Sequence, residues 1–231
     1  TKAFGNGGWH MLVLAPSDIQ EAVDMVYKAF DLADKYTNPV MVLPDGFTGS
    51  LTEPVVLPPM RTDEEVAAIE AAHTNVPSGN KGQMHRVFFR KPDLQEQNKD
   101  DWAMYEEWKT TEVEYETKYL EDAKIVVTSY GTSARIAESA VDVCREEGMK
   151  VGFIRPIKLY PFPEVAYDEI NYETTKGVLA REMSIPPQFA EDVKSALCRR
   201  APLESEVSSN GYILDRDDIV NHIKAMYAKA E

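Results

Sequence analysis

The stretch that decides the fold spans residues 124–163 and reads KIVVTSYGTSARIAESAVDVCREEGMKVGFIRPIKLYPFP. Its β-branched run at 125–128 predicts a strand, and the small polar residues within 129–133 predict a turn that supplies an N-cap oxygen for a helix. The helix carries apolar residues at helical spacing, and Gly148 offers a left-handed C-terminal cap. A second strand is expected at 151–154. Two strands joined through a packed helix predict a parallel βαβ unit with a right-handed crossover.

A similar strand, helix and strand are expected near the N-terminus. Residues 11–15 and 40–43 read as two buried parallel strands, and Ser17 with Gln20 predicts a capping box between them. The helix that follows should bury one apolar stripe, which consists of Ile19, Ala22, Val23, Val26, Phe30 and Ala33. Because most sheets have about four strands or more, we expect this unit to belong to a larger domain or to be completed by a partner.

Strands and helices continue to alternate toward the C-terminus. The expected elements are a short helix at 164–170, a strand at 177–180, a helix at 188–197, a short strand at 212–214 and a last helix at 217–229. This alternation is typical of a compact α/β sandwich, which we expect to cover residues 119–231.

The middle of the chain reads as a connecting arm. Residues 51–59 are rich in proline and lack periodicity, which indicates an extended linker. Thr62 and Glu65 then predict a capping box at the start of a short helix. A loop, a strand at 86–90 and a long acidic helix with several aromatic residues, within 93–122, should follow. Such a helix is typical of a strut packed along a neighbouring surface.

Composition argues against several classes of function. The 231 residues carry a formal charge of −14, which would repel a nucleic acid or an anionic membrane. No apolar run approaches the ~20 residues of a membrane helix and the N-terminus lacks a signal pattern, so we expect a cytoplasmic location. The two cysteines form no CxxC pair, so any iron–sulfur cluster should belong to another polypeptide. The scattered histidines disfavour a metal site.

The residues of the central stretch also resemble a known family. The run from Ser129 to Pro163 is similar to the C-terminal, transketolase-like domain of the α subunit of 2-oxoacid:ferredoxin oxidoreductases. The branched-chain (2-oxoisovalerate) and 2-oxoglutarate members are the most similar. The resemblance continues upstream through GNGGW at 5–9 and PVMVLPDG at 39–46, and downstream through VLAREM at 178–183.

This resemblance implies an α/β fold in which a partial pyrimidine-binding-domain βαβ segment precedes a transketolase C-terminal-like α/β sandwich. Residues 1–56 would be the C-terminal part of a thiamine-diphosphate pyrimidine-binding domain. Residues 57–118 would be the connecting arm, and residues 119–231 the transketolase C-terminal-like domain.

The reaction so implied is the oxidative decarboxylation of a 2-oxoacid to its acyl-CoA, with ferredoxin as electron acceptor. Thiamine diphosphate with magnesium would be shared with or held by a partner β subunit, and iron–sulfur clusters would lie on that or a γ subunit of the hetero-oligomer. The family's Tyr-Pro-Ile-Thr-Pro-type segment, its pyrimidine-binding glutamate and its GDG-type site are absent from these residues. We therefore expect an N-terminally incomplete subunit that is inactive alone, and we assign it no catalytic residue.

The glycine-rich loop at the start of the chain is the candidate cofactor contact. Gly5, Gly7 and Gly8 would let the backbone approach a ligand closely, and His10 could hydrogen-bond to it. The resemblance implies that this loop lies toward the cofactor. The loop is not a GxGxxG fingerprint and precedes its strand, so it does not predict a dinucleotide site, and a plain surface turn is the alternative.

Three further positions favour structural roles. Gly131, Thr132 and Ser133 could hold an anion at a helix N-terminus, but without a P-loop lysine they read as a helix cap. Arg155 should pair with a carboxylate. Glu182 stands where the family has a Glu-Met-Asn pattern followed by Gly-Gln, whereas this chain has EMSIPPQ at 182–188. We expect Glu182 to cap the following helix.

Two other interpretations remain open. The chain could be the pyrimidine-binding and C-terminal half of another thiamine enzyme, such as a transketolase or the β subunit of a 2-oxoacid dehydrogenase. Those enzymes transfer no electrons to ferredoxin, so ferredoxin reduction separates the two classes. The chain could also be a non-catalytic module that mediates subunit interaction.

Overall fold

Two sheets lie side by side in the computed structural model, which describes residues 8–73, 94–209, 211–212 and 215–230. The smaller sheet has the order β2-β1-β6. Its strands are β1 (Leu12–Leu14), β2 (Val40–Val42) and β6 (Lys158–Tyr160), with β1 parallel to β2 and antiparallel to β6. Helix α1 (Ile19–Tyr36) connects β1 to β2, which confirms the predicted N-terminal βαβ unit.

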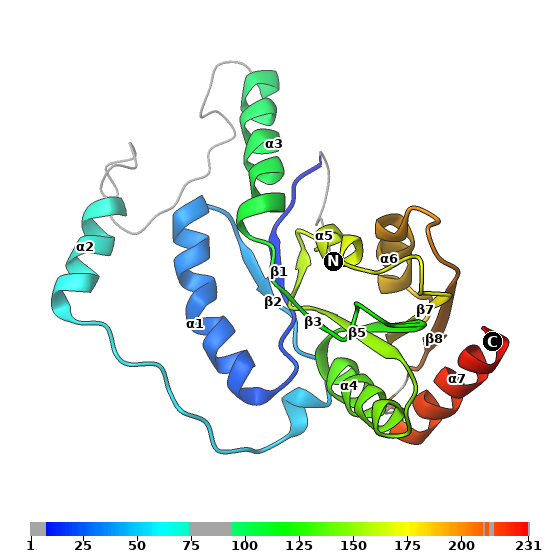
Figure 1. The fold of residues 1–231 in the computed structure, drawn as a ribbon. Coiled ribbons are helices and arrows are strands. Elements are labelled where there is room, and N and C mark those ends of the chain that lie inside the picture. The colour runs from blue at the N-terminus through cyan, green and yellow to red at the C-terminus, as the bar shows by residue number, and fades with distance from the viewer. Residues whose placement is uncertain (1–7, 74–93, 210, 213–214, 231) are drawn as a thin grey trace.

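The larger sheet has five strands in the order β3-β5-β4-β7-β8 (Figure 1). They are β3 (Tyr115–Lys118), β4 (Ile125–Ser129), β5 (Val151–Pro156), β7 (Gly177–Glu182) and β8 (Leu203–Val207). All pairs are parallel except β3 with β5. The helices around this sheet are α4 (Gly131–Glu146), α5 (Glu164–Asp168), α6 (Phe189–Leu197) and α7 (Arg216–Lys229).

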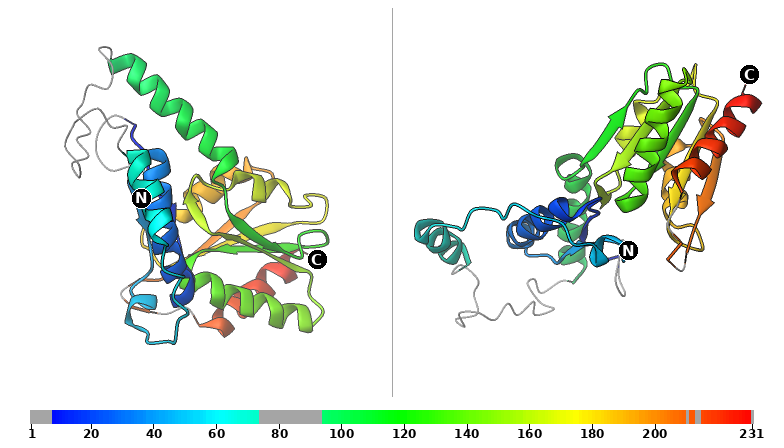
Figure 2. Two further views of the ribbon diagram at one scale, coloured as in Figure 1. Left: turned by 90° about the vertical axis from the view of Figure 1, so that its left-hand side faces the viewer. Right: turned by 90° about the horizontal axis from the view of Figure 1, so that it is seen from below.

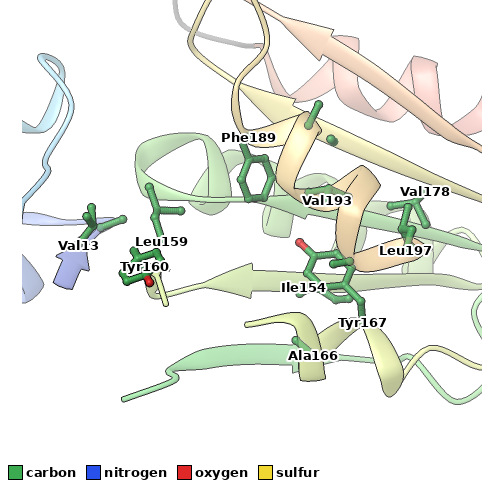
Figure 3. Close-up of a cluster of buried hydrophobic side chains, with 14 of the residues drawn as sticks. Val13, Ile154, Leu159, Tyr160, Ala166, Tyr167, Val178, Phe189, Val193 and Leu197 are labelled. Atoms are coloured by element: carbon green, nitrogen blue, oxygen red, sulfur yellow. The ribbon is translucent and has the colours of Figure 1, made fainter. Parts of the chain in front are cut away.

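Alternation of side chains along the strands divides these helices into two layers. Ile125 and Val127 of β4 pack with α4 and α7, whereas Val126 packs with α6 on the opposite face. Figure 2 shows the resulting sandwich of helix, sheet and helix layers from two sides. On the α6 face, Phe189, Val193 and Leu197 lie over the sheet near Tyr167 (Figure 3). The predicted α/β sandwich is confirmed.

The central βαβ unit also forms as predicted, including its C-terminal cap. Strands β4 and β5 are parallel, with Ile125 paired to Val151. Gly148 has a φ of 85°, and the N–H groups of Gly148 and Met149 bond back to the helix at 2.9 Å. A left-handed glycine that satisfies the last helix carbonyls in this way ends α4 without a steric penalty.

The buried face of α1 differs from the prediction. Met25 and Leu32 are the buried residues of this helix, whereas Val26 and Phe30 of the predicted stripe are 48% and 69% exposed. The cap differs as well, because Asp18, not Ser17, accepts the N–H of Glu21 at 2.8 Å. The helix carries apolar residues on two sides, and spacing alone does not tell which side faces the sheet.

Between β2 and β3 lie the short helix η1 (Thr48–Ser50), an irregular segment at 51–62, α2 (Asp63–His73) and α3 (Leu94–Thr111). The predicted capping box at Thr62 and Glu65 is confirmed, since each backbone N–H donates to the other's side chain. The predicted loop at 75–82 and strand at 86–90 lie outside the described residues. Strand β3 falls within the predicted arm 57–118 but pairs with β5 of the larger sheet. The domain limits 1–56, 57–118 and 119–231 stay a prediction.

Three strands were not predicted. β3 lies within the segment 93–122, which was expected to contain a helix. β6 follows β5 after one residue and turns back to pair with β1, so it links the two sheets. β8 has the sequence LESEV, in which acidic residues alternate along an edge strand. The predicted strand at 212–214 lies partly outside the described residues, and Tyr212 is exposed outside any strand.

A buried charge cluster holds the end of α3 against the smaller sheet. Lys158 has no exposed side-chain surface and donates to Glu112 at 2.8 Å, with Glu114 at 3.0 Å. Glu112 also accepts from Lys35 at 2.9 Å and from the hydroxyl of Tyr36, both at the end of α1. A buried cation needs partners of this kind, since an unpaired charge in the interior would cost several kcal/mol, on the order of 3 to 5.

Among the helices that the structure describes, none is both long and apolar enough to cross a membrane.

Candidate functional site

A pocket of about 270 Å³ lies between the two sheets, and we call it the inter-sheet pocket. Its lining residues are Leu43, Pro44, Asp45, Tyr130, Leu159, Ser184, Gln188, Phe189 and Asp192. Asp45 follows β2, Tyr130 follows β4 and Ser184 follows β7, so each lies beyond the carboxyl end of a parallel strand. Ligands of α/β proteins bind at this end of the strands. The pocket is therefore the candidate functional site.

Asp45 forms one wall of the pocket and caps a helix of the other domain. Its Oδ2 accepts the N–H of Thr132 at 3.0 Å, and its Oδ1 accepts the N–H of Thr48 at 2.9 Å. The hydroxyls of Thr48 and Thr132 lie 2.8 Å apart. Burial raises the pKa of Asp45, but these hydrogen bonds outweigh burial and hold the pKa below its ordinary value. The carboxylate is thus ionised at neutral pH.

This contact corrects the predicted cap of α4. The helix has no capping bond from its own N-cap residue, Tyr130. The oxygen predicted to come from 129–133 is replaced by that of Asp45, which lies 87 residues upstream of Thr132. Gly131 has a φ of 60°, and a Cβ there would lie 3.3 Å from Asp45 Oδ2. The glycine therefore permits both the left-handed turn and the close approach of the carboxylate. Residues 131–133 therefore form the first turn of α4, and the carboxylate of Asp45 satisfies the N–H of Thr132 in that turn.

Glu182 hydrogen-bonds to the lining residues Ser184 and Gln188 and caps α6, as predicted. The side chain is fully buried, and its two oxygens accept the N–H groups of Gln188, Phe189 and Ala190 at 2.9, 3.0 and 2.9 Å. The hydroxyl of Ser184 also donates to it. A carboxylate at a helix N-terminus is stabilised by these amides and by the helix dipole. All of this accords with a structural role for Glu182.

Tyr130 supplies a hydroxyl to the pocket. Its ring packs on Phe189 with centroids 5.1 Å apart. Burial raises the pKa of Tyr130 to about 12, and the nearby charges of Glu182 and Asp45 act in the same direction. The hydroxyl is therefore protonated, and a potential donor, at neutral pH. With Asp45 ionised, these two groups can orient a ligand by hydrogen bonding, but neither exchanges a proton near pH 7.

Arg155 is an ion-pair partner, as predicted. Its side chain is 7% exposed, and it pairs with Glu21 of α1 and, at 3.1 Å, with Glu116 of β3. The guanidinium therefore joins α1 to the larger sheet and does not line the inter-sheet pocket.

Family models account for almost the whole described chain. Residues 7–130 match the family described as pyruvate flavodoxin/ferredoxin oxidoreductase, thiamine-diphosphate-binding. Residues 123–219 match the pyruvate:ferredoxin oxidoreductase core domain II. This chain belongs to the pyruvate:ferredoxin oxidoreductase family. Its inter-sheet pocket thus lies between the segment that matches the thiamine-diphosphate-binding domain and the core domain II.

A curated relative agrees with this family membership, and two solved structures have a similar fold. The chain is 37% identical to the ketoisovalerate oxidoreductase subunit VorB of Methanothermobacter marburgensis, over 96% of this chain and 62% of the relative. The 2-oxoglutarate:ferredoxin oxidoreductase from Magnetococcus marinus, solved with 2-oxoglutarate, coenzyme A and succinyl-CoA bound, has a similar fold. The TM-score is 0.69 at 19% identity, over 96% of this chain and 43% of that one. A split-gene transketolase, an inactive β4 tetramer, gives a TM-score of 0.50 at 13% identity, over 96% and 58%.

The part of the glycine-rich loop that the structure describes does not reach the inter-sheet pocket. Gly5 and Gly7 lie outside them, and Gly8 is exposed with a φ of 72°. His10 precedes β1. Its ring stacks on the ring of Tyr160, with centroids 4.6 Å apart, and meets the ring of Tyr105 edge-on, with centroids 5.1 Å apart. The pocket lies beyond the opposite ends of β1 and β2. The assignment of these four residues to the cofactor stays a prediction.

The described residues do not fit the diphosphate and metal end of thiamine diphosphate. The pocket carries Asp45 and Asp192, and its lining, as far as the chain is described, contains no lysine or arginine. Carboxylates would repel a diphosphate. Nor does the described part of the chain hold a group of three histidine, cysteine, aspartate or glutamate side chains placed to bind a metal ion.

The sequence analysis did not predict that the residues lining the pocket lie together, although the sequence contains a signal for this arrangement. Asp45, Tyr130 and Ser184 each follow an expected parallel strand by two to four residues. The rule that ligands bind at the carboxyl ends of such strands would have selected them. The sequence analysis did not predict how the two sheets are placed relative to each other. This placement depends on β6, which follows β5 of the larger sheet and pairs with β1 of the smaller sheet.

Proposed function

We propose that this chain is part of the α subunit of a 2-oxoacid:ferredoxin oxidoreductase that converts a branched-chain 2-oxoacid, 2-oxoisovalerate, to its acyl-CoA and passes the electrons to ferredoxin. The observation that carries the proposal is the 37% identity to a ketoisovalerate oxidoreductase subunit over 96% of this chain. The family models over 7–130 and 123–219 support it. Because the chain spans 62% of that relative's length, the activity, substrate and subunit position are proposals. A cytoplasmic location belongs to the same proposal.

Partner subunits would complete the enzyme. Thiamine diphosphate, which stabilises the carbanion left by decarboxylation, would be held with its magnesium mainly by a β subunit. This division is supported by the acidic lining of the inter-sheet pocket. Iron–sulfur clusters would lie on the β or γ subunits, since Cys144 is buried and Cys198 lies on a different face of the sheet. Alone, the chain would be inactive.

The chain itself would build one wall of the active site and a subunit interface. Ionised Asp45 and protonated Tyr130 would orient a group of the cofactor or substrate that offers both a donor and an acceptor. The loop with Gly5, Gly7, Gly8 and His10 would contact the cofactor from the other end of β1. No residue of the chain is assigned to a bond-making step.

Reconstitution tests the proposal. The whole reading frame that contains residues 1–231 is combined with the β and γ subunits encoded beside it, and the CoA-dependent reduction of ferredoxin or a viologen dye is measured with several 2-oxoacids. We expect the largest kcat/KM with 2-oxoisovalerate. A complex that assembles but reduces the dye with no 2-oxoacid would refute the proposed reaction, and a preference for 2-oxoglutarate would refute the proposed substrate.

A second candidate is another thiamine-diphosphate enzyme of the transketolase or 2-oxoacid dehydrogenase β type. The similar fold of a split-gene transketolase favours it, with a TM-score of 0.50. Such an enzyme would transfer its product fragment to a sugar or a lipoyl group, so it would leave ferredoxin oxidised in the same assay.

A further inference from the structure

Helix α1 and the arm beside it expose an unusual amount of apolar surface. The large apolar side chains concerned are Val26, Tyr27, Phe30, Val56, Leu57 and Met60, and we call them together the α1–arm surface. Phe30 is 69% exposed and Met60 is 94% exposed. Scattered exposed apolar residues are ordinary, but a gathered set marks an interaction site.

The arm is held in this position by specific bonds. The amide of Gln20 donates to the carbonyl of Val56 at 2.9 Å and accepts its N–H at 2.8 Å. Farther along, Arg61 pairs with Asp31, donates to the Tyr27 hydroxyl at 3.2 Å and lies 5.0 Å over the Tyr27 ring. These two anchors bracket Leu57 and Met60. Figure 1 shows the arm running past α1 to α2, which stands apart from both sheets.

The anchors hold the arm beside α1 without burying its apolar side chains. Leu57 is still 72% exposed although it lies between the two anchors. Val56 is 77% exposed although its backbone forms one of them. Burial of a large aliphatic side chain contributes about 1.5–3 kcal/mol, so several such side chains provide a strong driving force for a protein partner.

The charge around this surface limits what can cover it. Within residues 51–69 the carboxylates are Glu53, Asp63, Glu64 and Glu65, whereas Arg61 is already paired with Asp31. The α1 lysines are turned away, because Lys28 pairs with Glu114 and Lys35 with Glu112. A second copy, also with a formal charge of −14, would be repelled, and so would an anionic membrane. The rim fits a partner that surrounds an apolar patch with lysine and arginine.

We propose that the α1–arm surface is the docking site for the partner β subunit, which meets it with an apolar patch rimmed by basic side chains. The identity of the partner rests on the proposed function. Leu57 and Met60 enter the apolar centre of the contact, and the acidic residues of the arm and α2 lie against the basic rim.

The test measures binding of the β subunit to the whole reading frame, by sedimentation or calorimetry, in variants of exposed positions that leave the fold intact. Leu57→Lys and Met60→Lys place a repelled charge in the contact, so each should weaken binding about tenfold or more. Leu57→Glu loses the same apolar contact but is attracted by the basic rim, so it should weaken binding less than Leu57→Lys. Val165→Lys, at a 47% exposed position on α5, is the matched control and should bind as the parent does.

The outcomes separate this proposal from the proposed function. A photo-reactive residue at position 60 should crosslink to the β subunit. Unchanged binding of both lysine variants, a greater loss with Leu57→Glu than with Leu57→Lys, failure of the parent to bind the β subunit, or a crosslink confined to a second copy or to the same polypeptide would each overturn it. Because binding is read without turnover, the surface can stand if 2-oxoacid oxidation fails, and it can fail while oxidation proceeds.

Discussion

The carboxylate of Asp45, next to β2 of the smaller sheet, accepts a hydrogen bond at 3.0 Å from the backbone N–H of Thr132, in the first turn of α4 of the larger domain. One side chain thereby caps a helix from outside its own domain. It also forms a wall of the inter-sheet pocket. The bond couples the relative position of the two sheets to the geometry of the candidate site.

Loss of this cap should lower stability measurably. We expect Asp45→Ala to reduce the free energy of unfolding by about 1 kcal/mol, the usual effect of removing an N-cap side chain. Because the folded pKa of Asp45 is depressed, its contribution is present above the unfolded pKa and is lost as the pH falls through the folded pKa. Urea unfolding at pH 7 measures the effect, and Glu53→Gln on the exposed arm is the control. An Asp45→Ala variant that is as stable as the parent would contradict the capping role.

The buried cluster around Glu112 should make the protein sensitive to acid. Burial raises the pKa of Glu112, but hydrogen bonds from Lys158, Tyr36 and Lys35 outweigh it and lower the pKa to about 2. The carboxylate stabilises the fold above its unfolded pKa, near 4.5, and this contribution is lost as the pH falls toward about 2.

The substitution that tests this cluster is Glu112→Gln. It removes one of the two carboxylates that neutralise buried Lys158 and leaves Glu114 at 3.0 Å, so we expect a loss of about 2 kcal/mol at pH 7. In the variant, the part of the acid dependence that comes from Glu112 should disappear. Thermal unfolding from pH 7 to pH 2.5 provides the comparison. Equal slopes of stability against pH in the two proteins would argue against the assigned role of Glu112.

Glu182 should be essential for the start of α6. Its oxygens accept three backbone N–H groups and the Ser184 hydroxyl, and an amide offers one acceptor oxygen in place of two. We expect Glu182→Gln to cost about 2 kcal/mol and to expose the first-turn amides of α6 to hydrogen exchange. Glu191→Gln, an exposed position in the same turn, is the matched control. Full protection of the amides of Phe189 and Ala190 in Glu182→Gln would be the contrary result.

His10 can be tested for packing and cofactor roles separately. His10→Ala removes the ring that stacks on Tyr160 and meets Tyr105, so we expect a loss of about 1 kcal/mol in stability. His10→Phe keeps a ring and should retain most of that stability. If the predicted cofactor contact exists, both variants should raise the concentration of thiamine diphosphate that half-saturates the assembled complex. An unchanged concentration in His10→Phe would remove His10 from the cofactor site.

Local patterns accounted for most of the regular elements and for part of the site. The β-branched run of β4, the left-handed Gly148 and the capping box at Thr62 are encoded within a few residues, so the sequence predicted them and the structure confirmed them. The cap formed by Glu182 was predictable for a similar reason, since its partners lie six to eight residues away. The inter-sheet pocket was not predicted, because its walls come from three separate strands.

The sequence by itself determined the helices other than η1, the two parallel βαβ units and, through family membership, the fold class, because these depend on short-range sterics and on hydrophobic periodicity. Only the tertiary structure decided which side of α1 is buried, that the polar segment of β8 is a strand and that Asp45 caps α4. These outcomes depend on partners far away in the chain. Their free energy comes from contacts that exist only after the two sheets have packed together.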